Sequence, residues 1–387
     1  MNDVSFLVKE RLRHIPSSLM RKLNKKYSDI GDMVMLTVGE PDFATPDHIK
    51  LAALQSILAN HSHYAPNRGT GQLRSAISNY LLRQFELDYD VNTQIIATNG
   101  ATEAISTAIN GIIDQDDVVL IPAPAFNLYG ILAAQNGGTP VTINTETTGF
   151  KLTPQLLTDY LEKYRDRVKI VVLNYPNNPT GTTYSVTEIQ ALADVLRRYP
   201  VVVLSDEVYS ELSYDVDHVS IAKLLPQQTL YVNSASKSYA MTGWRVGYLC
   251  GPKSMIDLLA KVHQANVATI GTPNMDAATE AFLAGDSDFQ RMKQVYALRR
   301  DYLCDALDEL GFNYIRPQGA FYIYVRVPDD FTGSAIEYTD LLANQAHVAT
   351  VPSEAFATGK SRYFRISYAT SLDNLKLAVQ RISKLHE

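Results

Sequence analysis

The chain has 387 residues, 46% of them hydrophobic and 20% charged, as expected for a soluble globular protein with a large core. Its 35 basic and 41 acidic side chains give a net charge of −6, which argues against a general nucleic-acid or anionic-membrane binder. The most apolar long stretch, 118–134, contains two prolines, an asparagine and a glycine, so no membrane span is predicted.

Compartment and metal content are constrained by cysteines and histidines. Cys250 and Cys304 are too few for a disulfide framework or a cysteine zinc site, and they predict buried thiols in a reducing compartment. The first residues lack the apolar core of a signal peptide, so we expect a cytoplasmic protein. His61 and His63 lie in a polar connection without nearby carboxylates, which favours surface positions and no metal site.

From about residue 94 to 250, apolar strand-like runs alternate with helix-period segments. This pattern predicts an α/β fold with a mainly parallel sheet. The run 95–98 leads into a glycine turn and a helix start at 100–102, whose free N–H groups and dipole suit a phosphate. Many such turns bind no ligand, and that alternative stays open.

Two further apolar strands end in polar side chains. The run 171–174 is followed by Asn178 in a turn fixed by proline and glycine, and the run 201–205 is followed by Asp206. Ligands of open α/β sheets bind at the carboxyl ends of the strands, which makes both residues candidates for a site. The alternatives are a bare turn at Asn178 and a helix-capping carboxylate at Asp206.

The most specific signal is Lys237 in 234–238 (SASKS), with Arg245 eight residues later. A lysine among hydroxyls and glycines can lose its proton and form an imine with an aldehyde, while hydroxyls and a guanidinium hold a phosphate. Pyridoxal 5′-phosphate carries both groups. Asp206 would keep the ring nitrogen of that cofactor protonated, and Tyr209 and Asn178 would hydrogen-bond its phenolic oxygen. The alternative for the lysine is a solvated residue at a strand end.

Towards the carboxyl terminus, a boundary at 286–287 precedes a long predicted helix through Arg299 and Arg300. The charged neighbourhood 297–301 is predicted to be a solvated helix face. The runs 319–324 and 363–367 are predicted strands, and the second places Arg365 on a rigid element. An arginine in an apolar strand needs an anion, either a ligand or an internal salt bridge.

Eight motifs occur in one order that is typical of a known family: 39–43 (GEPDF), Tyr64 before 69–74 (GTGQLR), 100–102 (GAT), 177–181 (NNPTG), 206–209 (DEVY), 234–237 (SASK), Arg245 and 364–367 (FRIS). Over essentially its whole length the chain resembles the fold-type I, pyridoxal-phosphate-dependent aminotransferases of class I/II. The resemblance implies the aspartate aminotransferase-like α/β fold, with a mainly parallel large domain at 46–287 and a smaller α+β domain formed by 1–45 and 288–387.

The resemblance also implies roles for individual residues. Lys237 would form the imine and move the proton, with Asp206 and Tyr209 as the other catalytic groups. The cofactor would be held by Gly100, Ala101, Thr102, Phe126, Asn178, Ser234, Ser236 and Arg245, together with Tyr64, which reaches the neighbouring subunit of a homodimer. Phe126 would stack on the ring. Arg365, Gly39 and Asn178 would bind the substrate, with Arg365 clamping its α-carboxylate.

The implied reaction is a ping-pong transamination between an amino acid and a 2-oxo acid such as 2-oxoglutarate. The segment 265–271 offers no arginine for a second carboxylate, and the motifs look closest to those of bacterial aromatic aminotransferases, so we expect aromatic donors. N-acetyl-diaminopimelate aminotransferases belong to the same subgroup and remain an alternative. A carbon–sulfur β-lyase is less favoured, as is a non-catalytic regulator, since the chain has no appended DNA-binding segment.

Overall fold

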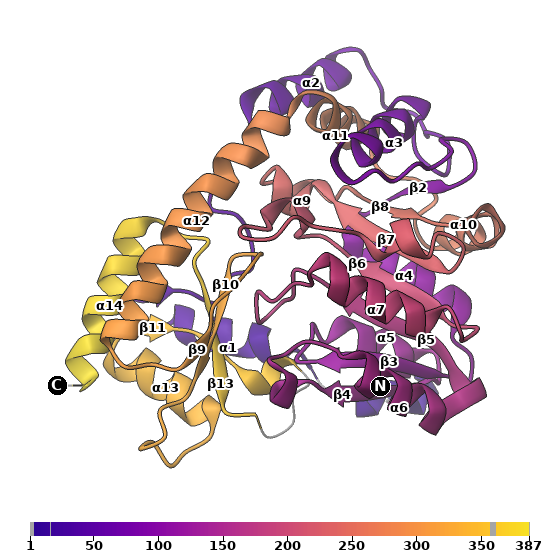
Figure 1. Cartoon of the computed structure of the whole chain (residues 1–387). Helices are drawn as coiled ribbons and strands as arrows, with labels where there is room; N and C mark the ends of the chain where they lie inside the picture. Colours follow the sequence, from indigo (N-terminus) through magenta and orange to yellow (C-terminus); the bar gives the residue numbers. More distant parts are fainter. Residues whose placement is uncertain (1–3, 16, 357–360, 387) are drawn as a thin grey trace.

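A seven-stranded sheet forms the centre of the larger part of the molecule (Figure 1). The computed structural model describes residues 4–15, 17–356 and 361–386. Strand order in the sheet is β2-β8-β7-β6-β5-β3-β4, and β8 alone runs against its neighbours. The strands are β2 (Ile95–Thr98), β3 (Val118–Ala123), β4 (Thr139–Asn144), β5 (Val168–Asn174), β6 (Val202–Asp206), β7 (Thr229–Ser234) and β8 (Gly247–Cys250). The expected mainly parallel sheet is therefore confirmed.

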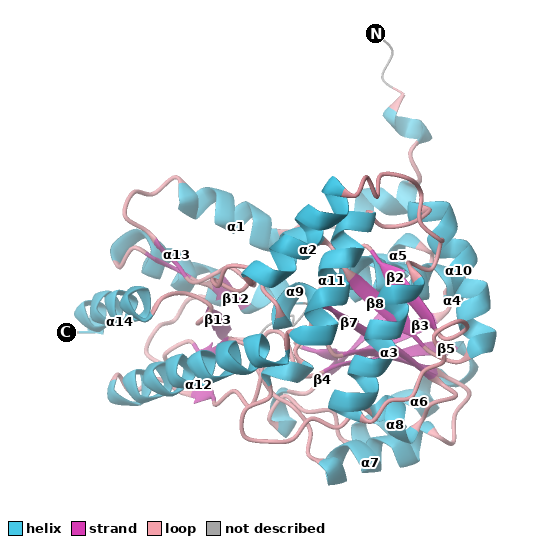
Figure 2. Ribbon diagram, turned by 90° about the horizontal axis from the view of Figure 1, so that it is seen from above, coloured by secondary structure: helices cyan, strands magenta, loops and turns pink. Residues whose placement is uncertain are grey.

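Helices cover both faces of this sheet (Figure 2). Those of the larger part are α2 (Asp47–Leu58), α3 (Gly71–Phe85), α4 (Gly100–Ile112), α5 (Leu128–Gln135), α6 (Pro154–Tyr164), α7 (Val186–Leu196), α8 (Ile221–Leu224), α9 (Ala235–Ser238), α10 (Lys253–Val267) and α11 (Thr272–Ala284). Because both faces are covered, the middle of each central strand is mostly apolar, as in residues 170–173 of β5. Polar side chains are thereby confined to the strand ends, where β5 finishes at Asn174 and β6 at Asp206.

A second, four-stranded antiparallel sheet has the order β12-β13-β10-β9. Its strands are β9 (Tyr314–Ile315), β10 (Tyr322–Arg326), β12 (Val351–Pro352) and β13 (Tyr363–Ser367), and β1 (Val34–Met35) pairs separately with β11 (Val348–Ala349). The helices here are α1 (Leu19–Ser28), α12 (Asp286–Glu309), α13 (Ala335–Gln345) and α14 (Leu372–His386). The strand predicted at 319–324 begins later than expected, at Tyr322, whereas the strand at 363–367 is confirmed.

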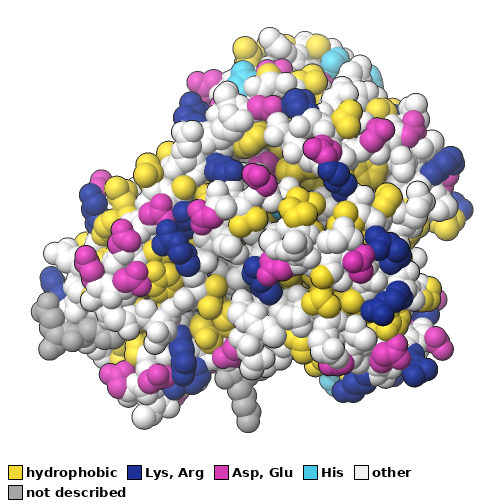
Figure 3. All heavy atoms as spheres, viewed as in Figure 1, with side chains coloured by type: hydrophobic (Ala, Val, Ile, Leu, Met, Phe, Trp, Pro, Cys, Tyr) yellow, Lys and Arg dark blue, Asp and Glu magenta, His cyan; other side chains and the backbone are white. Residues whose placement is uncertain are grey.

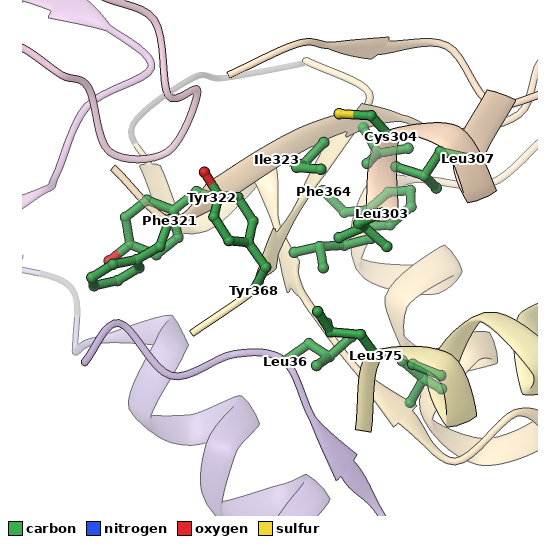
Figure 4. Close-up of a cluster of buried hydrophobic side chains, with 14 of the residues drawn as sticks. Leu36, Leu303, Cys304, Leu307, Phe321, Tyr322, Ile323, Phe364, Tyr368 and Leu375 are labelled. Carbon is green, nitrogen blue, oxygen red and sulfur yellow. The ribbon is translucent and has the colours of Figure 1, made fainter. Parts of the chain in front are cut away.

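The core of the smaller part joins segments that are distant in the sequence. Leu36 and Leu375 lie together with Leu303 and Phe364 in one buried cluster, which Figure 4 shows between β10, β13 and the helices. The segment before α2 thus packs with the carboxyl-terminal residues. We keep the division into 46–287 and 1–45 plus 288–387 as a proposal, motivated by the separate sheets and by the start of α12 at Asp286.

The prediction of a solvated helix face at 297–301 is wrong for two of its residues. Arg299 and Arg300 are only 9% and 4% exposed. Arg299 donates to both carboxylate oxygens of Asp42, at 2.7 and 2.9 Å, and Arg300 pairs with Asp215 and Asp301. Burial is tolerated because each guanidinium has a carboxylate partner. The Arg299–Asp42 pair ties the 39–43 loop to α12.

Charges are mixed on the outer surface. Figure 3 shows basic and acidic side chains interspersed over one face of the molecule.

Cys250 and Cys304 are buried and unpaired, as expected. Within the described ranges, no helix combines the length and apolar character needed to cross a bilayer.

Candidate active site

A cavity of about 280 Å³ lies at the carboxyl ends of β5, β6 and β7, between the two sheets. Its lining is Met20, Gly39, Ala101, Thr102, Ile105, Phe126, Tyr129, Asn174, Asn178, Asp206, Val208, Tyr209, Ser234, Ser236, Lys237, Thr242, Arg245, Tyr322 and Arg365. Nearly all of the site residues predicted from the sequence are therefore brought together. The exceptions are Tyr64 and Gly100, which directly precedes the lining residue Ala101.

The amine of Lys237 points towards the 39–43 loop. The Nζ atom donates to the carbonyl oxygen of Gly39 at 2.6 Å and lies about 6 Å from the ring centres of Tyr209 and Phe321. Burial lowers the pKa of this amine to about 8, and the positive charges of Arg365 and Arg245 act in the same direction. A neutral amine is the form that attacks an aldehyde, so this lysine is poised for covalent chemistry near neutral pH.

Asp206 is a buried carboxyl with one strong hydrogen-bond donor. It is 4% exposed, and the hydroxyl of Tyr129 donates to its Oδ2 at 2.5 Å. Burial raises the pKa of Asp206 to about 6, an effect that the Tyr129 hydrogen bond opposes. A buried carboxylate without a basic partner in contact favours a cationic ligand group, such as a protonated ring nitrogen.

Arg365 is 1% exposed and faces neutral acceptors. Its Nη1 donates to the amide oxygen of Asn178 at 2.8 Å and its Nη2 to the carbonyl oxygen of Thr37 at 2.6 Å. Its Nε has no hydrogen-bond partner, and within the described ranges no carboxylate forms a salt bridge with it. The alternative of an internal salt bridge is thus not supported, and the guanidinium fits an anionic ligand.

Arg245 closes the opposite end of the cavity above the start of α4. Its Nη1 donates to the carbonyl oxygen of Thr242 at 2.8 Å, and its backbone adopts a left-handed φ of 57°. Gly100 has a φ of +76°, and a Cβ there would lie 2.4 Å from Arg245 Nη2. Only glycine permits this approach, which brings the guanidinium to the free N–H groups of the helix.

The hydroxyls and aromatic ring predicted for the cofactor also line the cavity. Ser234 caps α9, since its Oγ accepts the N–H of Ser236 at 3.3 Å, and Phe126 lies before α5. Tyr64 is different, because it is 93% exposed and lies along a separate surface groove with His61 and His63. Within one chain it does not reach the cavity, so its role stays a prediction about a neighbouring subunit.

Sequence reasoning missed several lining residues, chiefly Tyr129, Tyr322 and Met20. Tyr129 lies three positions after Phe126, and its hydroxyl in the mostly apolar stretch 118–134, which also contains Asn127, is the signal that marks it. Tyr322 was predicted only as a strand residue. Met20 comes from α1, far away in sequence, and no local pattern connects it to the cavity.

Replacing Tyr129 with phenylalanine tests the support of Asp206. Loss of the 2.5 Å hydrogen bond should raise the pKa of Asp206 further and weaken retention of a cationic ligand at neutral pH by about tenfold. Equilibrium dialysis with pyridoxal phosphate between pH 6 and 8 measures this, with Tyr160→Phe, at a partly buried tyrosine outside the cavity lining, as control. Equal affinity of Tyr129→Phe and wild type at every pH would contradict the assignment.

A family model described as Aminotransferase class I and II matches residues 31–382. The chain belongs to this family. The match spans all of the motifs at the cavity and both sheets, so it covers the site as well as the fold.

Named relatives of this aminotransferase differ in substrate. The chain is 39% identical to the "Probable N-acetyl-LL-diaminopimelate aminotransferase" of Bacillus subtilis, over 97% of this chain and 95% of that protein. It is 35% identical to "Aromatic-amino-acid aminotransferase 2" of Thermococcus litoralis, over 97% of each chain. Among solved structures, the Thermus thermophilus aspartate aminotransferase with maleate superposes with a TM-score of 0.93 at 32% identity, over the full length of both chains.

The fold is thus the aspartate aminotransferase-like fold, and the enzyme is an aminotransferase that depends on pyridoxal phosphate. The cavity fits that cofactor on its own chemistry. It holds an amine with a lowered pKa, a buried carboxyl without a basic partner and, at the Gly100 turn, an arginine above free helix N–H groups. These are the groups needed for its aldehyde, ring nitrogen and phosphate.

Proposed function

We propose that the enzyme transfers the amino group of aromatic amino acids to a 2-oxo acid such as 2-oxoglutarate, in a ping-pong reaction. Pyridoxal phosphate supplies the aldehyde that bonds to amines and the ring that accepts electrons from the substrate carbon. Lys237 would hold the cofactor covalently and, once displaced by substrate, move the proton at the substrate's α-carbon. Asp206 would keep the ring nitrogen protonated, and Arg365 would bind the α-carboxylate.

The observation that carries the aromatic assignment is the set of charges in the cavity. Its cationic side chains are Lys237, Arg245 and Arg365, each of which already has a role at the amine, the phosphate or the α-carboxylate. Among the residues that the structure describes, this lining offers no further cation for a carboxylate in the substrate side chain. Phe126, Tyr322 and Met20 instead provide rings and a flexible apolar chain, which favour an aromatic or large apolar side chain.

N-acetyl-LL-diaminopimelate is the second candidate donor, because a relative 39% identical to this chain is named for its transamination. Its distal carboxylate, like the second carboxylate of 2-oxoglutarate, would need a cation from outside the single-chain cavity. A carbon–sulfur β-lyase is a third, less favoured candidate, because the same anchoring lysine serves both chemistries.

An absorption spectrum of the purified enzyme, titrated with single amino acids, distinguishes these candidates. With tyrosine or phenylalanine, the visible band of the bound cofactor should fall as a near-ultraviolet band rises, in the absence of any oxo acid. Conversion by N-acetyl-LL-diaminopimelate or aspartate but not by aromatic amino acids would overturn the substrate assignment. Release of pyruvate and ammonia from cystathionine without an oxo-acid acceptor would instead identify a lyase.

Arg365 should be needed for every substrate. Arg365→Leu removes the bidentate donor, and kcat/KM should fall by about 10² to 10³ for aromatic amino acids and oxo acids alike. Arg365→Lys should recover little of this, because an ammonium cannot form the planar fork. Steady-state kinetics measure the effect, with the exposed Arg316→Leu as control. A loss limited to one substrate would place Arg365 at the side chain instead of the α-carboxylate.

We further propose a homodimer in the cytoplasm. Tyr64 is 93% exposed, and α2 beside it exposes Leu51, Leu54, Ile57 and Leu58, an apolar face that a second copy would cover. Two unpaired, buried thiols agree with a reducing compartment. Light scattering should give about twice the mass of the chain, and Tyr64→Phe should weaken retention of the cofactor without changing that mass.

A further inference from the structure

Tyr322 lies against Tyr209, Arg365 and Gly39, although the sequence alone predicts only a strand at this position. It is the first residue of β10 and is 1% exposed. Its hydroxyl lies 2.8 Å from the hydroxyl of Tyr209, and the guanidinium carbon of Arg365 lies 4.3 Å from the centre of its ring. One buried side chain thus contacts both a predicted cofactor ligand and the predicted carboxylate clamp.

The contact with Arg365 restrains a charge that has few other partners. The guanidinium also lies 5.1 Å from the ring centre of Phe356, so aromatic rings from two different segments hold it. Both Nη atoms donate to neutral acceptors, so the ring contacts act together with these two hydrogen bonds to restrain the orientation of Arg365. Loss of the Tyr322 ring would leave the charge buried and held by fewer contacts.

The contact with Tyr209 concerns the direction of a proton. Either hydroxyl can donate in this pair. When Tyr209 donates to a ligand oxygen in the cavity, its own oxygen is left to accept the hydroxyl of Tyr322. A hydroxyl that accepts one hydrogen bond donates more strongly in the next, so Tyr322 would strengthen Tyr209 as a donor.

Gly39 completes the arrangement. A Cβ at this position would lie 2.6 Å from the hydroxyl oxygen of Tyr322, and the Gly39 carbonyl accepts the hydrogen bond from Lys237. The absence of a side chain at Gly39 therefore leaves space for the Tyr322 hydroxyl beside Tyr209. This gives the glycine a structural reason that is separate from room for substrate.

We propose that Tyr322 is a positioning residue that couples the carboxylate clamp to the cofactor's phenolic-oxygen site. Its ring holds Arg365, and its hydroxyl directs the proton of Tyr209. Binding of a carboxylate at Arg365 then changes how strongly Tyr209 binds the cofactor's phenolic oxygen. Binding of that oxygen at Tyr209 must change the affinity for the carboxylate by the same factor. The inference rests on the proposed roles of Arg365 and Tyr209. Asn178, which also contacts Arg365, provides a second and independent link.

Two substitutions separate the ring from the hydroxyl. Tyr322→Phe keeps the ring over Arg365 and removes the hydroxyl, whereas Tyr322→Leu removes both. Tyr324→Phe, two residues along the same strand and outside the cavity lining, is the matched control. The probe is 3-phenylpropionate, an aromatic acid without an amino group, so that binding is observed without turnover.

For wild type, saturating 3-phenylpropionate should shift the pH midpoint of the cofactor's visible band. In Tyr322→Phe this shift should fall by at least half, while affinity for the acid stays within about threefold of wild type. In Tyr322→Leu, affinity for the acid should fall roughly tenfold, the size expected for loss of a buried cation–π contact. Calorimetry on the cofactor-free protein should show the same loss of affinity, which makes that readout independent of turnover.

The outcomes separate this inference from the proposed function. If both Tyr322 variants match Tyr324→Phe in the midpoint shift and in acid affinity, the inference is wrong while the transaminase remains. If both variants instead melt at a lower temperature and lose the cofactor, with the ratio of midpoint shift to acid affinity unchanged from wild type, Tyr322 has only a structural role. The coupling is then again wrong. If the wild-type protein forms no cofactor band, the proposed function itself fails.

Discussion

Lys237→Ala should abolish transamination, with a loss of about 10⁴-fold or more, because it removes the proposed covalent anchor, which is also the group proposed to move the proton. Pyridoxal phosphate should still bind in the cavity, since Asp206, Arg245 and the start of α4 are unchanged. It should then be removable by dialysis and resist reduction onto the protein by borohydride. Mass spectrometry after borohydride treatment distinguishes the two forms directly.

The same substitution should raise the stability of the cofactor-free protein at pH 7, because the pKa of Lys237 is lowered by folding. The pKa of Lys237 is about 8 in the folded chain, below the ordinary 10.5 of a lysine, so folding costs free energy while the amine is charged. That cost is full below pH 8 and disappears as pH rises towards 10.5. Cofactor-free Lys237→Ala should therefore unfold at a higher denaturant concentration than wild type at pH 7. Lys253→Ala, an exposed control, should not. Full activity of Lys237→Ala would refute the mechanism.

The sequence was sufficient to predict those residues of the candidate site whose positions follow from the ends of the strands. Asn178 and Asp206 follow buried parallel strands, and adjacent parallel strands must bring their carboxyl ends to the same edge. Their proximity was therefore a consequence of the fold class. The start of α4 follows the same logic, because a helix begins directly after β2, whereas Arg245 is predicted from its spacing to Lys237.

The contacts that could not be predicted join elements with no shared pattern. Tyr129 meets Asp206 across 77 positions, and Tyr209 meets Tyr322 across 113. Arg299 meets Asp42 across 257 positions, and in the sequence it is one charge in a charged helix. Local periodicity reports which face of an element is buried, but it carries no information on which distant polar group is the partner. Such pairs appear only when the packing is known.

Buried partners of this kind hold charged or polar side chains in fixed positions away from water. Glu207, next to Asp206, accepts hydrogen bonds from Ser205, Ser220 and Tyr175 and pairs with His218 at 2.6 Å. It is fully buried, yet its oxygens are satisfied. Asp206 by comparison has one strong donor, so one residue is anchored by the protein while its neighbour is left for a ligand.

Asp206→Asn should lower cofactor affinity and turnover but raise the stability of the cofactor-free protein at pH 7. The amide keeps the shape but cannot hold a positive charge at the ring nitrogen, so cofactor affinity should fall about 100-fold and turnover about 10³-fold. Activity assays at saturating cofactor separate the two effects. Asp159→Asn, on the exposed face of α6, serves as control. Unchanged turnover at saturating cofactor would remove Asp206 from the catalytic groups.

Stability of the cofactor-free protein should change in the opposite sense. The folded pKa of Asp206 is about 6, against 3.8 for an ordinary aspartate, so the folded chain binds more protons between pH 4 and 6. The free energy of unfolding of wild type therefore falls as pH rises through that window, by on the order of 3 kcal/mol. Asp206→Asn does not titrate, so it should be more stable than wild type at pH 7 and nearly equal at pH 4. Urea titrations at the two pH values measure the difference. Equal stability at both would mean that Asp206 gains as much from its protein contacts as burial costs it.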